Sequence, residues 1–244
     1  MSSYPELMLL IGIEWHKRDG APVINPADES ALGTVPHTTR SDLDAAIAAA
    51  EDGYRVWRRT APAKRAEIIV RAADLLRERV DEIAVTITLE QGKTIAESRA
   101  EILRAAEIIE WDANEGRRVY GRVIPGEPGL RHSVLRQPVG LVAAFTPWNF
   151  PISSPARKVG GALSAGCAII LKASEETPGG AYHLAQAFID AGVPAGVLNL
   201  IYGVPSEISE YLIPHPSIRL ITFTGSIPVG KHLAQLAAKG MKRT

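Results

Sequence analysis

Four apolar runs after Gly140 constrain the fold of this chain more than any other feature of its sequence. They span residues 141–145, 168–171, 197–201 and 220–223, and a segment with helical periodicity follows each of them. Regular alternation of a buried strand with a helix is typical of a parallel sheet that has helices on its faces. The sequence therefore predicts an α/β fold with a parallel sheet and flanking helices.

Helical patterns dominate the amino-terminal region. Apolar side chains recur at helical spacing in three stretches, which we predict as helices over residues 41–59, 60–91 and 94–111. Ser41 with Asp44, and Thr94 with Glu97, have the spacing of a capping box at the start of a helix.

Two other parts of the chain predict strands. The apolar run 7–13 predicts an opening strand, because it is too short to cross a membrane and lacks the basic segment that begins a targeting signal. The runs 119–124 and 132–136 flank turn-forming residues and predict a hairpin. Their alternation of apolar and polar residues is weak, so we expect the hairpin to protrude from the body.

The balance of charges limits the partners of the chain. Its 27 Lys and Arg residues equal its 27 Asp and Glu residues, so no global field attracts nucleic acid or an anionic membrane, and we expect neither as a partner. The single cysteine, Cys167, excludes an intrachain disulfide and is predicted to be a small core residue. The six histidines lack metal-ligand spacing, so we predict no metal site. These features fit a cytoplasmic location.

Chemically distinctive residues come directly after the four apolar runs. Ligands of parallel α/β sheets bind outside the carboxyl ends of the strands. The runs lead, in order, into a Trp-Asn pair between prolines, a Lys-Ala-Ser-Glu segment, a glycine, and a Thr-Gly-Ser segment that precedes a helix. These segments are residues 146–151, 172–175, 203 and 224–226. The last of them offers free helix N-terminal N–H groups to an anion.

Each segment also has a purely structural interpretation. The Trp-Asn pair can pack and satisfy a turn, the Lys and Glu can be solvated, and Gly-Ser can simply cap a helix. Residues 225–231 additionally match the spacing of a phosphate-binding P-loop. His232 replaces the Ser or Thr that holds Mg²⁺, and Pro228 removes one loop N–H, so a P-loop NTPase is the least favoured alternative.

Three stretches taken together resemble the signatures of the aldehyde dehydrogenase superfamily. They are residues 147–151, 171–178 and 223–226, and they occur in the order that the family shows. The resemblance covers nearly the whole chain and is strongest to succinate-semialdehyde dehydrogenases. It implies that residues 1–244 are a Rossmann-like NAD(P)-binding domain, that the hairpin 117–138 contributes to a homo-oligomer, and that the function is NAD(P)-dependent oxidation of an aldehyde to a carboxylic acid.

The resemblance implies roles for individual residues. Asn149 would donate its amide to the oxyanion that forms when a thiolate attacks the aldehyde. Lys172 and Glu175 would bind the hydroxyls of the adenosine ribose. Because a carboxylate repels a 2′-phosphate, Glu175 favours NAD, with NADP as the alternative. Gly225 and Ser226 would lie against the pyrophosphate. The other implied cofactor contacts are Trp148, Ser174, Gly203 and Gly230.

Two neighbouring residues concern the substrate and its chemistry. An Arg at the position of Arg157 faces the substrate entrance in the succinate-semialdehyde branch, so the resemblance implies an aldehyde with a carboxylate or hydroxyl group at its far end. Lys158 matches a lysine beside the substrate channel and is a catalytic candidate. Its alternative is a surface lysine on a helix.

The chain also departs from the family pattern. Pro205 stands where family members often carry a second glycine after Gly203. The family's general-base Glu, in a Glu-Leu-Gly-Gly stretch, and its nucleophilic Cys are not among the 244 residues, and Cys167 does not match that nucleophile. We therefore expect a truncated chain that lacks the catalytic-cysteine domain and is inactive by itself. A non-catalytic nucleotide-binding or subunit-pairing module is the alternative function.

Overall fold

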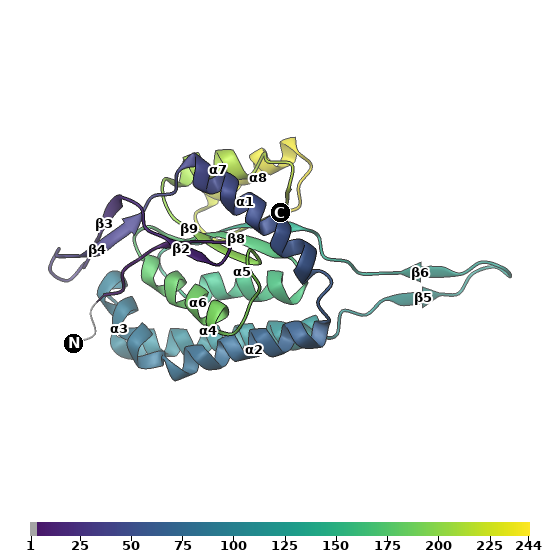
Figure 1. The fold of residues 1–244 in the computed structure, drawn as a ribbon, viewed down its shortest axis with the longest axis horizontal. Coiled ribbons are helices and arrows are strands. Elements are labelled where there is room, and N and C mark those ends of the chain that lie inside the picture. Colours follow the sequence, from purple (N-terminus) through teal and green to yellow (C-terminus); the bar gives the residue numbers. More distant parts are fainter. Residues whose placement is uncertain (1–3) are drawn as a thin grey trace.

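The computed structural model describes residues 4–244 and confirms the predicted α/β architecture (Figure 1). Among these residues, one sheet has six strands in the order β10-β7-β8-β9-β1-β2. They are β1 (Leu9–Ile11), β2 (Glu14–His16), β7 (Leu141–Phe145), β8 (Ala168–Lys172), β9 (Leu198–Ile201) and β10 (Ile218–Phe223).

The four strands predicted after Gly140 form the parallel part of this sheet. β7 lies between β10 and β8, so that Phe145 has Phe223 on one side and Lys172 on the other. Every residue of β7, β8 and β9 is buried. Burial on both faces explains why these strands are continuous apolar runs rather than alternating ones.

The other edge of the sheet differs from the sequence-based expectation. The predicted opening strand is present as β1, but it runs antiparallel to β9, and β2 pairs outside it. A separate two-stranded sheet follows, formed by β3 (Gly20–Ile24) and β4 (Ala31–Pro36). No sequence pattern predicted β2, β3 or β4, because they are short and partly exposed.

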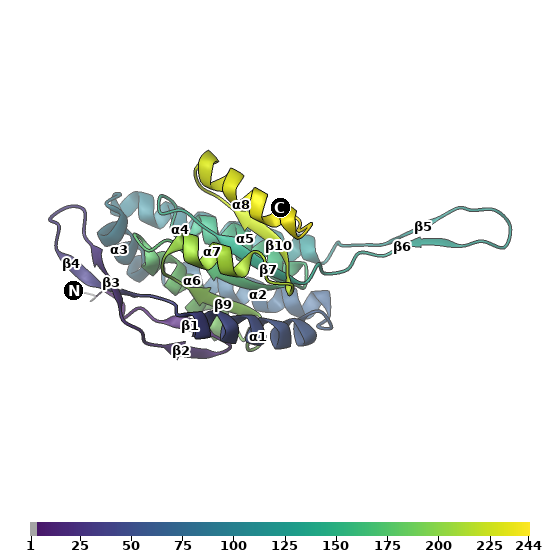
Figure 2. The same ribbon diagram turned by 90° about the horizontal axis from the view of Figure 1, so that it is seen from above.

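Eight helices within residues 4–244 cover the two faces of the main sheet (Figures 1 and 2). α1, α7 and α8 lie on one face, and α5 and α6 lie on the other, where α2, α3 and α4 pack outside them. Their bounds are α1 (Arg40–Trp57), α2 (Pro62–Glu78), α3 (Val80–Gln91), α4 (Ile95–Gly116), α5 (Ser153–Ser164), α6 (Pro178–Asp190), α7 (Pro205–Leu212) and α8 (Ile227–Lys239). None of these helices is both long enough and apolar enough to cross a membrane.

Two helix boundaries correct the prediction. Thr39, not Ser41, caps α1: its hydroxyl accepts the N–H of Asp42, whose carboxylate accepts the N–H of Thr39. Arg18 binds the same carboxylate, with Nη2 at 2.7 Å, so Asp42 joins the helix cap to a tertiary contact. The predicted second helix is two helices, α2 and α3, which meet at Arg79 with φ −102° and ψ 14°.

The capping box at the start of α4 is confirmed. The Thr94 hydroxyl accepts the N–H of Glu97, and the Glu97 carboxylate accepts the N–H of Thr94. Just before it, Gly92 ends α3 in the left-handed conformation, with φ 82°. Glycine adopts this conformation without the steric cost that other residues incur. The link between α3 and α4 is therefore short and fixed.

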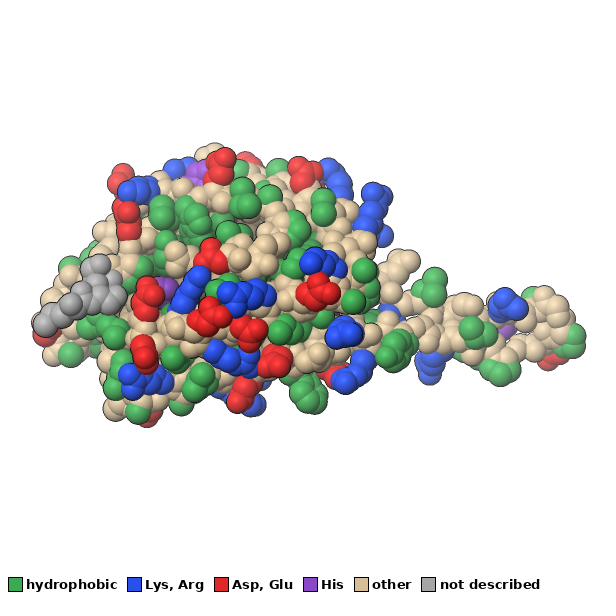
Figure 3. All heavy atoms as spheres, turned by 60° about the horizontal axis from the view of Figure 1, so that its bottom comes forward, with side chains coloured by type: hydrophobic (Ala, Val, Ile, Leu, Met, Phe, Trp, Pro, Cys, Tyr) green, Lys and Arg blue, Asp and Glu red, His purple; other side chains and the backbone are tan. Residues whose placement is uncertain are grey.

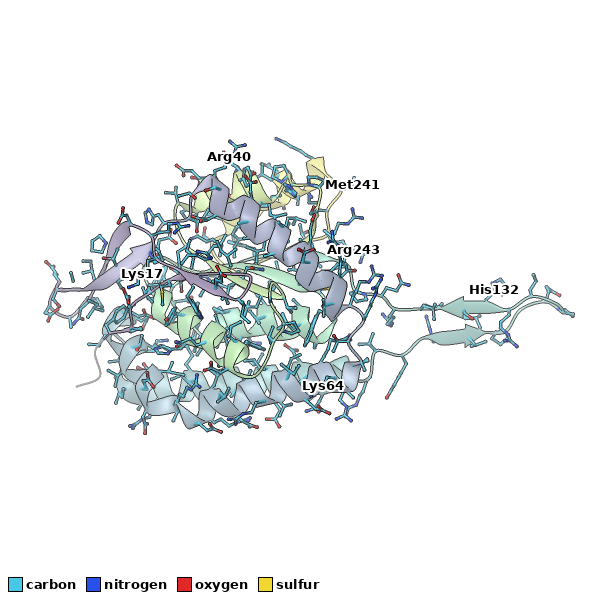
Figure 4. The ribbon with its side chains drawn as sticks, in the orientation of Figure 1. Lys17, Arg40, Lys64, His132, Met241 and Arg243 are labelled. Carbon is cyan, nitrogen blue, oxygen red and sulfur yellow. The ribbon has the colours of Figure 1, made fainter. Side chains whose placement is uncertain are left out.

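The predicted hairpin projects from the body as a two-stranded arm, residues 117–138 (Figures 1 and 2). Its strands are shorter than predicted and form β5 (Arg122–Ile124) and β6 (His132–Val134). Figure 4 shows His132 well away from the main sheet. Hydrophobic and basic side chains are spread along the arm (Figure 3). β5 and β6 form a sheet of two strands only. Because an isolated two-stranded hairpin is marginally stable in water, packing against another surface would stabilise the arm.

Candidate functional site

The predicted site segments meet at the carboxyl ends of the four parallel strands, which form one edge of the sheet. Backbone hydrogen bonds continue past the strands: the N–H of Thr146 donates to the carbonyl of Lys172, and the N–H of Thr224 donates to the carbonyl of Phe145. The loops after β7, β8 and β10 therefore start side by side. Parallel pairing of β8 with β9 adds the loop that contains Gly203 to the same edge.

The loop after β7 presents Asn149. The Trp148 carbonyl accepts a hydrogen bond from the Thr177 hydroxyl at 2.9 Å, and the Asn149 carbonyl accepts one from Lys93 Nζ at 3.1 Å. Within residues 4–244, the structure gives the side-chain amide of Asn149 no hydrogen-bond partner, and the residue is exposed. A fixed backbone that carries an unused amide donor is the arrangement that oxyanion binding requires.

A cavity of about 720 Å³ opens beside Asn149. Arg104 of α4 and Arg157 of α5 line it, and both also line an adjoining cavity that contains Asp112. Burial raises the pKa of Asp112 to about 6, against the opposing effect of Arg157. An amide donor thus shares one cavity with guanidinium groups, which bind carboxylates or similar anions well.

Lys172, the last residue of β8, contacts Glu175 in the loop that follows. The Lys172 side chain is only 5% exposed, that of Glu175 is 26% exposed, and the two charged groups are in direct contact. The Ser174 hydroxyl is used within the loop, since it donates to the Glu176 carboxylate and accepts the N–H of Glu176. Lys172 and Glu175 together offer a donor and an acceptor at one point, which suits the neighbouring hydroxyls of a ribose.

Glycines shape the backbone at the ends of β9 and β10. Gly203 has a φ of 126°, a conformation that favours glycine. A Cβ on Gly225 would lie 2.5 Å from the ring of Phe223, and one on Gly230 would lie 3.2 Å from it. Ser226 is the N-cap of α8 but makes no side-chain capping bond. The N–H groups of the first turn therefore remain available to an anion such as a pyrophosphate.

The donors at this edge fit a dinucleotide. The α8 N-terminus supplies N–H groups for phosphate without a basic patch, while Lys172 and Glu175 can bind ribose hydroxyls two strands away. Gly225 and Gly230 allow the turn before α8 and its first turn to pack closely on the Phe223 ring, which fixes the position of the helix N-terminus. The chemistry of the residues present is thus compatible with a bound nicotinamide dinucleotide.

Lys158 is buried, which contradicts the surface-lysine alternative. It extends from α5, is 9% exposed, and donates from Nζ to the Thr224 hydroxyl at 2.8 Å, with the Thr222 hydroxyl at 3.4 Å. Burial, together with the weaker effect of the positive charge on Arg157, lowers the pKa of Lys158 to about 8. Lys158 therefore links α5 to the end of β10 at the candidate site.

Cys167 lies at the amino ends of the parallel strands, opposite to the candidate site. It precedes β8 at the amino end of that strand, whereas Asn149 follows the carboxyl end of the neighbouring strand β7. The residue is 3% exposed, and burial raises the pKa of its thiol. The prediction of a small core residue is confirmed.

Sequence reasoning missed several side chains that shape the site. Lys93 contacts Glu101 and the Asn149 carbonyl, and Thr177 ties the loop after β7 to the start of α6. Arg104 shares the cavity with Arg157. These residues lie on elements far apart in the sequence, so no local pattern marks them. The sequence pattern showed only that Gly92 and Lys93 separate two helices.

Comparison with known proteins gives consistent results. The model of the aldehyde dehydrogenase family matches residues 15–244. A 4-(hydroxymethyl)benzenesulfonate dehydrogenase from Comamonas testosteroni is 46% identical over 239 residues, which are 96% of this chain and 50% of that protein. The NADP-dependent succinate-semialdehyde dehydrogenase of Escherichia coli strain K12 is 42% identical over 238 residues, which are 96% of this chain and 49% of that protein.

Solved structures agree with the sequence comparison. The crystal structure of an E. coli NADP-dependent enzyme has a TM-score of 0.96 and 41% identity, and the match covers 99% of this chain and 51% of that chain. The present chain thus spans about half the length of the relatives that it matches.

Proposed function

Since the chain belongs to the aldehyde dehydrogenase family, we propose that it is the cofactor-binding half of an enzyme that oxidises an aldehyde to a carboxylic acid with NAD or NADP. The observation that carries this proposal is the meeting of Asn149, the Lys172–Glu175 pair and the uncapped α8 N-terminus at one sheet edge. A bound nicotinamide cofactor would supply the hydride acceptor. The residues of this chain would bind the cofactor and orient it and the aldehyde.

The proposed cofactor contacts follow from the chemistry of each loop. Gly225 and Ser226 place the first N–H groups of α8 against the pyrophosphate, and Gly230 keeps the helix close to Phe223. Lys172 and Glu175 bind the adenosine ribose. Three further residues complete the proposed set: Trp148 and Gly203 border the site on the loops after β7 and β9, and Ser174 acts by shaping the loop after β8.

Asn149 is the proposed oxyanion donor, and Lys158, which contacts Thr224 just after β10, is the proposed ionisable group of the site. Asn149 lines the cavity into which an aldehyde would enter. The lowered pKa of Lys158, about 8, leaves its ammonium able to lose a proton near neutral pH. Residues 4–244 supply neither a thiolate nor a general base at the site. The proposed role of this chain is therefore to position the cofactor and the aldehyde.

The proposed substrate carries an anionic group at the end remote from the aldehyde. Arg157 lines the cavity beside Asn149 and can bind a carboxylate or a sulfonate. The names of two relatives contain a benzenesulfonate and a succinate semialdehyde, both of which have such a group. We also infer a cytoplasmic location, since the one cysteine is free and buried.

Glu175→Ser tests the cofactor assignment. The carboxylate accepts a hydrogen bond from a ribose hydroxyl but repels a 2′-phosphate, whereas Lys172 attracts that phosphate. We expect the ratio of the dissociation constants for NADP and NAD to fall by about ten- to a hundredfold, measured by calorimetric titration of the chain. Glu67→Ser on α2 makes the same charge change on an exposed surface and should leave the ratio unaltered. An unchanged ratio in Glu175→Ser would place Glu175 away from the ribose.

The arm, residues 117–138, is the proposed contact with a second copy of the chain. Val123 and Leu135 are 73% and 75% exposed, so the arm offers apolar surface that a partner would bury. We expect Val123→Glu and Leu135→Glu to lower the mass of the oligomer toward that of the monomer in size-exclusion chromatography with light scattering. Val56→Glu, at an exposed position on α1, is the control. Wild-type mass in both arm variants would exclude the arm from the interface.

A further inference from the structure

Two charged side chains, Lys93 and Glu101, bind the backbone of the turn that carries Asn149. Neither has a part in the reaction proposed above. Lys93 lies in the link between α3 and α4, and Glu101 lies on the second turn of α4. Lys93 Nζ is 2.5 Å from Glu101 Oε2, and the side chains are only 12% and 4% exposed. Charges that are this well buried require a partner, so the pair must stay together in the folded protein.

The other side-chain hydrogen bonds of the pair join it to the backbone of the Asn149 turn. Lys93 Nζ donates to the carbonyl of Asn149 at 3.1 Å. Glu101 Oε1 accepts the N–H groups of Ile152 and Ser153, each at 3.1 Å. Those N–H groups open α5, which has no capping bond from its own N-cap side chain. Glu101 therefore caps α5 from another helix, where a carboxylate is favoured.

Lys93 is itself held in place. Its N–H donates to Gln91 Oε1 at 3.1 Å, and Gly92 and Thr94 fix the ends of the two helices that it joins. Its ammonium also lies 4.9 Å from the centre of the Phe150 ring, within the range of a cation–π contact. The turn is thus gripped on both sides of Asn149 by groups from a rigid helical junction.

We propose that Lys93 and Glu101 are positioning residues for Asn149: they hold its carbonyl and the helix turn that follows, and so fix the place of Asn149 in the lining of the cavity. This inference rests on the proposed role of Asn149 as oxyanion donor. Donors to an oxyanion act through preorganisation, and a misplacement of about 1 Å can reduce a rate on the order of 10²-fold. The two residues act through Asn149 and need not touch the aldehyde.

The double variant Lys93→Met/Glu101→Gln is designed to test positioning without leaving a buried charge. A glutamine side chain has the same shape as that of Glu101, so its Oε1 can still accept the two N–H groups of α5, while the bond from Lys93 to Asn149 is lost. A matched control is Lys64→Met/Glu67→Gln, which removes an exposed ion pair of 3.0 Å on α2 (Figure 4). The single variant Lys93→Arg keeps the charge and a donor, and covers the case in which the double variant does not fold.

Amide hydrogen exchange of the chain itself is the first measurement. We expect exchange in residues 148–153 to speed up about tenfold in the double variant, as for the loss of one charge-assisted hydrogen bond, with β7, β8 and α6 unchanged. Lys93→Arg should exchange like the wild type, and the control pair should change nothing at the site. Unchanged exchange in residues 148–153, or faster exchange throughout the protein, would overturn the proposal.

Hydride transfer is the second measurement, in an active aldehyde dehydrogenase that contains this chain. We expect the double variant to slow the single-turnover rate about ten- to a hundredfold at unchanged cofactor affinity. Adding Asn149→Ala should then cost no more than Asn149→Ala alone, because both changes remove the same contribution. Independent, multiplied losses would contradict positioning. If Asn149→Ala alone has no effect, the oxyanion role fails, and the exchange result still decides whether the pair holds the turn.

Discussion

Asn149→Ala is expected to slow hydride transfer by about 10²–10³-fold, or ~3–4 kcal/mol, in an active aldehyde dehydrogenase that contains this chain. The amide of Asn149 has no other hydrogen-bond partner within residues 4–244, so its removal should take away stabilisation that arises only in the transition state. NAD affinity and melting temperature should remain close to those of the wild type.

A structural role of Asn149 predicts a different set of results. If the side chain only stabilised its turn, the variant would melt early and would lose cofactor binding and turnover together. Asn114→Ala is a matched control, since Asn114 lies on the exposed surface of α4 and donates only to a backbone carbonyl of the same helix. Normal single-turnover hydride transfer in folded Asn149→Ala protein would remove Asn149 from the mechanism.

The 244 residues by themselves should not oxidise aldehydes, with a loss on the order of 10⁶-fold relative to an enzyme that has its nucleophile. Their one thiol, Cys167, is buried at the edge of the sheet opposite Asn149, and burial raises its pKa. The chain incubated with NAD and a short aldehyde should show no increase in NADH absorbance, and Cys167→Ala should behave identically. Steady NADH production that Cys167→Ala leaves intact would show that the reaction needs no thiolate from a cysteine.

Local sequence pattern was enough to predict the parallel half of the fold. Strands β7, β8 and β9 are buried throughout, and β10 is partly buried at the border of the sheet; each contains an apolar run with helix signals around it. The edge strands β2, β3 and β4 were missed, because their partly exposed residues give no such run. The cap of α1 was placed at Ser41 instead of Thr39, because both residues have an Asp three positions later; the contact of Asp42 with Arg18, 24 residues earlier, is invisible to a local pattern.

The candidate site shows the same division. The residues that follow the strands, such as Asn149, Lys172 and Gly225, could be predicted because parallel topology gathers the strand ends at one edge. Burial of Lys158 against Thr224 could not be predicted, since a lysine on a helix is usually exposed. The hydrogen bond from Lys93 to the Asn149 carbonyl could not be predicted either, because the two residues lie 56 positions apart in the sequence.

Cofactor binding by the isolated chain tests the central claim most directly. NADH should bind saturably in a fluorescence titration, because every proposed contact to the dinucleotide lies within these residues. Gly225→Val should weaken that binding at least about tenfold, since a side chain there meets the Phe223 ring and displaces the turn before α8. Val56→Glu, on the far surface of α1, should not. A folded chain that shows no saturable binding of NADH or NADPH up to millimolar concentrations would contradict the assignment of this sheet edge as a nicotinamide dinucleotide site.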